Sequence, residues 1–529
     1  MKHSEVKGHS YDYLQIVQSA REGAKVRQKV VANLGRLDQL LESGQLDRIV
    51  NGLAQYSRAY DLYRAFVEGR FSSCLTRTWG PALVFGRLWE RQGLPRILRG
   101  LASDRKFEFD IERACFALAL QRLCHPGSDL EGSAWLATVE CPGFSELKLH
   151  QLYRTCSFLA GVREKLETEL FLKDRDLLNR ELDLVFLDTT STFIYRDEET
   201  EVFKRGYSRD HRPDQPQVML CVAVDRRGWP IAWEFFPGNT ADRGSFRQVI
   251  TSLRGRFRIR EVTVVADRGM ISAKNIELLE EEPAPYTYVL GCRMRKQKEV
   301  SEEVLSRAGR YQVVADNLEV KDVMVDERRY VVCLNRDEAK RDALAREAIL
   351  EKLKVKLAGE GTKDLIGNRG YARFLKKKKD AFEIDEAAVE RDARLDGKFV
   401  LRTNTDLPTA EVAKSYKGLW RVERTFREEK STLEMRPLYH HRDENRIGHI
   451  VASFLALRLE VDLQRRLDER GMDIPWLDVL RDLGRVQAVD LELEGGRFRI
   501  RTDLIGRAPL LFAAAGVRPP PRLWAPEGL

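Results

Sequence analysis

The sequence lacks the features that mark membrane and secreted proteins. None of its 529 residues lie in an uninterrupted apolar run of roughly 18 residues, the length that spans a bilayer. The N-terminal stretch, MKHSEVKGHSYDYLQ, has no apolar segment typical of a signal peptide. We therefore expect an intracellular protein without a membrane partner.

Cysteine and histidine are scarce, with eight of each, and neither shows the spacing of a metal site. No C-x-x-C pair occurs, and no cysteine stands at zinc-finger spacing from a histidine. The cysteines therefore predict buried thiols in a reducing cytosol. His440 and His441 have no partner at metal-ligand spacing, which favours a structural role for both. The chain also lacks internal repeats and low-complexity tracts.

The residues that are present describe a folded, mildly basic protein. Hydrophobic residues make up 43% and charged residues 33%, a balance that excludes wholesale disorder and fibrous structure. The length corresponds to three or four domains of about 150 residues each. Lys and Arg exceed Asp and Glu by 90 to 82, giving a net charge of +8. This excess permits nucleic-acid binding but does not establish it, because acids are also abundant.

The residue pattern predicts an α/β protein made of six parts. Helical periodicity without strand-like alternation marks the second part, and alternating apolar strands, a hairpin and helices mark the third. In chain order the parts are a small strand-rich or mixed unit (1–50), a helical region (51–180), the first part of an α/β core (181–295), an insertion with charged helices (296–395), the second part of the core (396–465) and a C-terminal tail (466–529).

Two apolar strands of the core end on an aspartate. Asp188 ends the run VFLD and Asp267 ends the run VVAD. Ligand crevices in open α/β sheets form at the carboxyl ends of strands. Two carboxylates held close together repel unless a cation lies between them, and oxygen ligands suit Mg²⁺ or Mn²⁺. Aspartates after strands also commonly cap helices or begin turns, so the pair alone leaves both interpretations open.

A segment near residue 420, AEVAKSYKGLWRVERTFREEKSTLE, offers a third acid. At about 100° per residue in a helix, Tyr416, Glu423 and Lys430 fall on one stripe. Trp420 and Arg427 share this stripe, and a neighbouring apolar stripe could dock the helix onto the sheet. Glu423 would then face the crevice, while Tyr416 and Lys430 could hold a phosphate backbone. A solvated face with charge pairs four residues apart is the alternative.

The same segment resembles a known family motif. The string Y-x-x-L-W-R-V-E-R-T-F-R-x-x-K, followed by STLEMRPLYHH and IGHI, is similar to the C-terminal motif of DDE transposases of the IS4 superfamily. Within that superfamily it is most similar to the IS1634-like insertion-sequence transposases. The blocks FLDTTSTFIY, GWPIAWEFFPGNTAD and VTVVADRGMIS agree in order, and the N-terminal strings YDYLQIV and VVANLG are also similar.

The resemblance implies an RNase H-like catalytic domain with an insertion, preceded by a mainly helical N-terminal DNA-binding region. It implies that Asp188, Asp267 and Glu423 are the catalytic and metal-binding triad. The resemblance also implies Mg²⁺ as the cofactor, bound as two ions, and Mn²⁺ as a substitute.

The family motif also assigns DNA contacts. Its tyrosine and lysine match Tyr416 and Lys430. Leu419 stands where the family has an arginine, and Arg427 is the better substitute for that role by helix geometry.

The implied function is that of a bacterial DNA transposase in the cytoplasm, associated with the nucleoid. It would bind the terminal inverted repeats of an insertion sequence and catalyse metal-dependent cleavage and strand transfer into target DNA, acting as a homodimer in the DNA complex. Two alternatives stay open. One is a catalytically inactive DNA-binding protein derived from a transposase, and the other is an RNase H-like nuclease without strand transfer.

Overall fold

The structure, a computed structural model, describes residues 2–6, 9–22, 25–54, 56, 60, 68, 71–178, 184–208, 211–240, 242–255, 263–270, 272–281, 286–357, 369–378, 381–419, 438–493 and 496–524. The chain divides into two compact units. One consists of Met1–Thr78, Arg485–Ile505 and Pro519–Leu529, and the other of Trp79–Gly484 and Gly506–Arg518. Within the described ranges, no helix combines the length and the apolar character needed to cross a bilayer.

The first unit begins with a three-stranded antiparallel sheet in the order β1-β2-β3. Its elements are β1 (Lys2–Val6), β2 (His9–Glu22) and β3 (Lys25–Arg36), followed by the helices α1 (Leu37–Glu42) and α2 (Gln45–Ala54). Leu40 of α1 is buried and its side chain lies next to Gly35 of β3. The first helix therefore folds back against the sheet.

A second sheet of the first unit joins distant parts of the chain. Its order is β18-β17-β16-β4, from β4 (Phe71–Thr78), β16 (Gln487–Leu493), β17 (Gly496–Arg501) and β18 (Leu523–Trp524). Asp490 of β16 accepts ion pairs from Arg77 at 3.1 Å and from Arg499 at 2.6 Å. The C-terminal segment, whose local pattern is weak, thus gains its order from a strand 413 residues earlier.

The second unit contains a helical region around a central buried helix. Its helices are α4 (Gly80–Arg91), α5 (Leu94–Leu101), α6 (Ile111–Cys124), α7 (Asp129–Leu136), α8 (Leu149–Leu178), α17 (Asp443–Asp468), α18 (Trp476–Gly484) and α19 (Ala508–Ala515). Almost every residue of α6 is buried. Asp110 caps α6 by accepting from two backbone N–H groups, and Ser128 and Glu131 form a capping box at α7.

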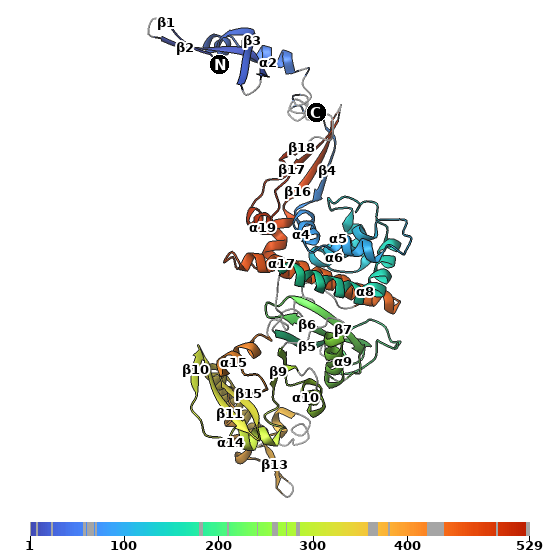
Figure 1. Ribbon diagram of the computed structural model, residues 1–529, viewed down its shortest axis with the longest axis vertical. Coiled ribbons are helices and arrows are strands. Elements are labelled where there is room, and N and C mark those ends of the chain that lie inside the picture. The colour runs from blue at the N-terminus through green and yellow to red at the C-terminus, as the bar shows by residue number, and fades with distance from the viewer. Residues whose placement is uncertain are drawn as a thin grey trace. The chain divides into compact units, whose positions relative to one another are not determined.

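Helices α8 and α17 lie along each other (Figure 1). Gly448 of α17 faces the backbone carbonyl of Cys156 of α8, with no room for a side chain between them. Farther along, the buried Arg458 of α17 pairs with Asp174 of α8 at 2.9 Å, and its guanidinium lies 4.5 Å from the ring centre of Trp229. A close backbone approach and a buried ion pair therefore fix the two helices together.

A nine-stranded mixed sheet forms the rest of the second unit, in the order β10-β11-β12-β15-β9-β8-β5-β6-β7. Six of its strands are β5 (Leu184–Phe193), β6 (Gln217–Asp225), β7 (Pro230–Pro237), β8 (Thr263–Ala266), β9 (Thr287–Gly291) and β15 (Lys398–Thr403). Strands β5, β8 and β9 are parallel, whereas β5, β6 and β7 are antiparallel. The helices α9 (Asp242–Gly255) and α10 (Ala273–Leu279) flank β8 in sequence. The predicted α/β core with central parallel pairs is confirmed.

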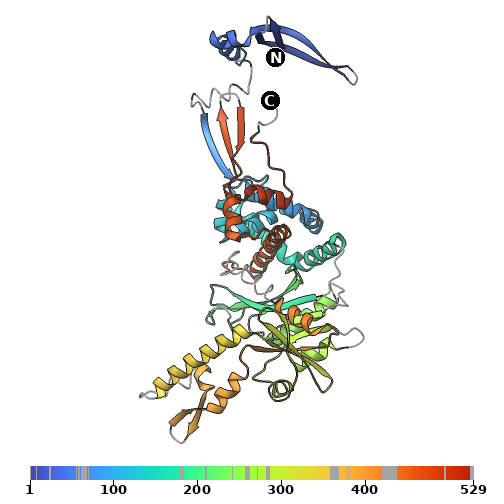
Figure 2. The same cartoon turned by 90° about the vertical axis from the view of Figure 1, so that its left-hand side faces the viewer.

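The remaining three strands come from the segment where charged helices were expected. They are β10 (Gln312–Ala315), β11 (Leu318–Val325) and β12 (Arg328–Leu334), which reach β9 through β15. The segment also holds the π-helical turn η1 (Glu299–Val304), α11 (Arg336–Leu357), α13 (Arg369–Ala372), β13 (Leu375–Lys378), β14 (Ala381–Ile384) and α14 (Glu386–Ala393). Figure 2 shows α11 extending from the sheet, with the β13–β14 hairpin near it. The strands escaped prediction because the sequence of β11 does not alternate strictly: Lys321 is buried and Met324 is exposed.

The close approach of α8 and α17 generates a stability prediction. Gly448→Ala should lower the free energy of unfolding by about 1–3 kcal/mol or more, because the added methyl group overlaps a backbone carbonyl that cannot rotate away. Gly100→Ala in α5 is the matched control, since no atom lies within 4 Å of its Cβ position. That variant should stabilise the protein by roughly 0.5–1 kcal/mol through helix propensity. Equal melting temperatures for the two variants would contradict this account of the interface.

Candidate active site

The parallel strands bring the two predicted aspartates to neighbouring positions. In the sheet, Leu187 of β5 pairs with Ala266 of β8, and Ala266 pairs with Leu290 of β9. The next residue on β5 is Asp188, and the residue after β8 is Asp267. Neighbouring strands lie about 4.8 Å apart, so both carboxylates leave the sheet side by side where the parallel pairing ends.

Both aspartates lie at the rim of a buried core. All four residues of β8 are buried, and Val185, Phe186 and Leu187 of β5 are also buried, whereas Asp188 and Asp267 are half-buried. The backbone N–H of Thr189 donates to Asp188 Oδ1 at 2.7 Å. Solvent can therefore reach both carboxylates, while the strands behind them hold their backbone in place.

Tyr416 contacts the second aspartate directly. It lies near the end of α15 (Thr409–Lys417), and its hydroxyl donates to Asp267 Oδ1 at 2.9 Å. Its ring stacks against Phe399 of β15 with 5.7 Å between the ring centres. Burial raises the pKa of Tyr416, and the negative charge of Asp267 raises it further, so the phenol stays protonated and remains a hydrogen-bond donor.

Two glycines make room for this helix on the sheet. A Cβ at Gly291, the last residue of β9, would overlap the Tyr416 hydroxyl. A Cβ at Gly418 would lie 2.6 Å from the ring of Phe186, which shares a face of β5 with Asp188 because the two are separated by one residue. The end of α15 therefore rests on the same face of the sheet as the aspartates.

An arginine that sequence reasoning missed holds the turn after the second aspartate. Arg293 donates to the carbonyl oxygen of Arg268 at 2.8 Å and to that of Gly269 at 2.9 Å. Met270 closes the same turn by donating its N–H to the carbonyl of Asp267 at 3.0 Å. No local motif marks Arg293, because its partners are backbone atoms more than twenty residues earlier. Gly291 was missed for a related reason, since only the folded chain brings Tyr416 next to it.

The other predicted site residues lie outside the described part of the chain. This applies to Glu423, Arg427 and Lys430, and also to Trp420, so their assignment stays a prediction. The described range 381–419 ends at Leu419, which is buried, as expected for a residue of the apolar stripe of this segment. The structure thus brings together Asp188, Asp267 and Tyr416, and Glu423 belongs to residues 420–437, which it does not describe.

Comparison with known families identifies both parts of the chain. Residues 182–459, more than half of the chain, match the family described as the transposase DDE domain. Residues 2–63 match the N-terminal domain of IS1634 family transposases. The first match contains the strands that carry both aspartates, and the fold class inferred from the sequence, an RNase H-like catalytic domain preceded by a mainly helical region, is confirmed.

Two solved structures are similar to parts of the chain. One is the piggyBac transposase in a synaptic complex with hairpin DNA, with 11% identity and a TM-score of 0.39, covering 77% of this chain and 79% of the other. The second is the Mos1 transposase paired-end complex with the left transposon end, with 14% identity and a TM-score of 0.15, covering 34% of this chain and 60% of the other. No curated protein sequence matches significantly. On the strength of the two family matches, the chain belongs to the DDE transposases and is an insertion-sequence transposase of the IS1634 type.

Proposed function

We propose that this transposase cleaves DNA and joins it to a target at a site formed by Asp188, Asp267 and Glu423. The observation that carries the proposal is the parallel register of β5 and β8, which sets the two aspartates side by side at the point where this parallel pairing ends. Glu423 follows Gly418 by five residues, and Gly418 contacts the face of β5 on which Asp188 lies. The reaction class is phosphodiester hydrolysis followed by attack of the freed 3′-hydroxyl on target DNA.

The donor set fits a hard divalent cation. DDE transposase domains depend on divalent metal ions. The three proposed ligands are all carboxylates, so the triad offers oxygen atoms and neither sulfur nor imidazole nitrogen. Asp188, Asp267 and Glu423 would hold Mg²⁺, with Mn²⁺ as a substitute, and two ions fit three carboxylates at a phosphodiester. Bound there, the metal would supply activation of the attacking oxygen and stabilisation of the leaving one.

Tyr416 acts in this proposal as the residue that positions Asp267. Its hydroxyl donates a hydrogen bond to Oδ1 of Asp267 and thereby fixes the orientation of the carboxylate. In the family motif this tyrosine contacts DNA. A phenol that contacts the carboxylate of Asp267 would also lie close to the reacting phosphate, so Tyr416 could both position Asp267 and contact DNA. Arg427 and Lys430 would hold the cleaved end through its phosphates.

DNA is the partner that this function requires, both as terminal inverted repeats and as target. We assign repeat recognition to residues 1–180, which carry none of the triad acids. The solved relatives are complexes with transposon or hairpin DNA, and two copies of this chain acting at paired ends would account for joining both ends of an element. A nuclease that cuts without joining is separated from this proposal by an assay for joined product.

The acids generate the first functional prediction. Asp188→Asn, Asp267→Asn and Glu423→Gln should each abolish cleavage of terminal-repeat DNA while leaving repeat binding nearly intact. Without metal the variants should melt no lower than wild type, because removing one of several crowded carboxylates relieves repulsion. With Mg²⁺ they should lose the stabilisation that a bound ion gives to the folded state.

Asp225→Asn is the matched control for these variants. Asp225 ends β6 and accepts from the backbone N–H of Arg227 and of Trp229, both at 2.8 Å, so its role is to hold a turn. Asparagine preserves such a turn, and cleavage and the Mg²⁺ response should both persist. A variant at Asp188 or Asp267 that melts lower yet still cuts DNA would remove that residue from the site.

The contact between Tyr416 and Asp267 generates the second functional prediction. Tyr416→Phe removes one hydrogen bond and should lower the rate of cleavage by roughly 10–100-fold. Gly291→Ala should have at least as large an effect, because the methyl group displaces the tyrosine from the carboxylate. Gly255→Ala, at an open position at the end of α9, should cleave at the wild-type rate. Wild-type cleavage by Gly291→Ala would exclude a positioning role for this contact.

The N-terminal elements generate the third functional prediction. Removing residues 1–54, which hold β1–β3, α1 and α2, should abolish the preference for terminal-repeat DNA over unrelated DNA of equal length. Residual binding should remain and should weaken steeply with rising salt, because Lys and Arg contacts to phosphates dominate it. Gel-shift titrations of the two proteins at several salt concentrations measure both effects. Unchanged preference would place repeat recognition elsewhere.

A further inference from the structure

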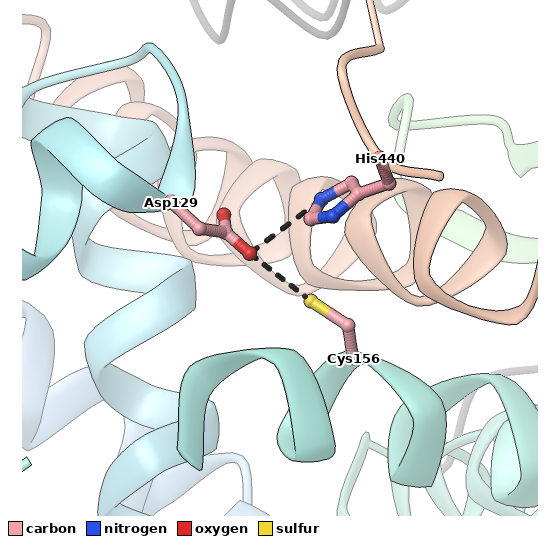
Figure 3. Close-up of side chains that lie close together, drawn as sticks. All are labelled: Asp129, Cys156 and His440. Atoms are coloured by element: carbon pink, nitrogen blue, oxygen red, sulfur yellow. Dashed lines mark hydrogen bonds and ion pairs between the residues drawn. The ribbon is translucent and has the colours of Figure 1, made fainter. Parts of the chain in front are cut away.

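A buried cluster of three side chains lies apart from the DDE carboxylates. Asp129 is the first residue of α7, Cys156 lies in the N-terminal third of α8, and His440 lies just before α17. Figure 3 shows the three side chains converging from these elements. Their exposed fractions are 2%, 0% and 8%. Three groups that ligate transition metals are therefore collected in the protein interior.

Two of the three distances between the ligand atoms match a tetrahedral metal site. Asp129 Oδ2 lies 3.5 Å from Cys156 Sγ and 3.5 Å from His440 Nε2, and the three atoms lie within 4.8 Å of one another. Zinc binds oxygen and nitrogen at about 2.0–2.2 Å and sulfur at about 2.3 Å, so ligand atoms around it lie roughly 3.3–3.7 Å apart. Small adjustments of the side chains would therefore admit an ion.

Neighbouring groups orient the cluster. The buried guanidinium of Arg122 binds Asp129 Oδ1, which leaves Oδ2 directed toward the thiol and the imidazole. His449 places Nδ1 at 3.2 Å from His440 Nε2 and is itself buried.

A pocket gives solvent access to the cluster, and, among the residues that the structure describes, a neighbouring histidine has a ring nitrogen without a hydrogen-bond partner. A pocket of about 530 Å³ opens onto Asp129, His440 and His449, with Tyr153 and Ser157 also on its wall. In the described part of the chain, Nε2 of His449 is buried and has no hydrogen-bond partner. An ion can enter through the pocket, and a water molecule from the pocket can complete its coordination shell.

We propose that Asp129, Cys156 and His440 bind a transition-metal ion of the zinc class. A thiolate and an imidazole select such an ion over Mg²⁺, which prefers oxygen ligands. The ion would tie α7 and α8 to the segment that precedes α17. That segment follows residues 420–437, which contain Glu423, so the metal would anchor the chain leaving the DDE site. The positive charge of Arg122 opposes the ion, and a single carboxylate and a thiolate offset it.

Cobalt substitution in the full-length protein tests the proposal. After chelation and dialysis, Co²⁺ should give the sulfur-to-metal charge-transfer absorption of a cobalt thiolate, which marks this site alone because the DDE acids offer only oxygen ligands. The intensity should correspond to one cobalt thiolate per chain, and Zn²⁺ should then remove it. Zn²⁺ should also raise the melting temperature of the wild-type protein, because it binds only the folded state. Cys156→Ser and His440→Gln should lose the absorption and the zinc-dependent shift in melting temperature.

Matched variants separate this site from other thiols and from the DDE acids. Cys333→Ser removes a thiol that is equally buried in β12, and His441→Gln changes the neighbouring histidine. Both should keep the cobalt spectrum, as should Asp188→Asn. A wild-type protein without the thiolate absorption overturns the proposal even if Cys156→Ser fails to fold. Absorption that persists in Cys156→Ser, or that disappears in Cys333→Ser, would also overturn it.

Discussion

The parallel pairing of β5, β8 and β9 is the constraint on which the catalytic half of this transposase depends. The pairing of Leu187 with Ala266 sets Asp188 beside Asp267. The pairing of Ala266 with Leu290 sets Gly291 on the other side of Asp267, on the neighbouring strand β9. A slip of one residue would turn Asp188 to the opposite face of the sheet, because side chains alternate along a strand. Both faces of these strands are buried, so a slip would exchange side chains of different size and shape between two packed layers, which is destabilising. Core packing thereby enforces the geometry of a polar site.

The helical region extends this constraint through buried polar contacts. Arg458 of α17 donates to Asp174 of α8 and to the backbone carbonyl of Pro230 at the start of β7. Trp229 donates its indole N–H to the same Asp174 at 2.7 Å, beneath the guanidinium. Removing Arg458 or Asp174 would leave the other charge buried without its partner, which would lower the free energy of unfolding. The stabilising effects of Arg458, Asp174 and Trp229 therefore depend on one another. The helices and the edge of the sheet in the second unit are therefore mechanically coupled.

The sequence predicted those features that are written locally, and it missed those that exist only after folding. Apolar runs ending in Asp188 and Asp267 predicted two strands with neighbouring carboxylates, and the parallel pairing of β5 with β8 confirms that the two positions are neighbours. The predicted strand end is correct for Asp267, which follows β8, but wrong for Asp188, because β5 continues to Phe193 through its pairing with β6. The strand β4 and its partner β16 could not be paired in advance, because nothing near Phe71 or Gln487 encodes a partner at the other end of the chain. Gly291 and Arg293 gave no signal, since their roles arise from contact with Tyr416 and with the turn after Asp267. The family resemblance supplied the role of Glu423, which helix geometry alone left undecided.

The buried cluster shows the same limit for metal ligands. Spacing rules detect sites whose ligands share a loop or a helix, whereas Asp129, Cys156 and His440 span 312 positions of sequence and meet only because α8 and α17 approach closely at Gly448. The absence of a short cysteine–histidine motif therefore excluded a zinc finger but not a metal site. The two candidate sites differ in ligand chemistry, with oxygen alone at the DDE acids and sulfur, nitrogen and oxygen in the cluster. Hard and soft cations would accordingly be sorted between them, so that a structural ion need not compete with the catalytic one.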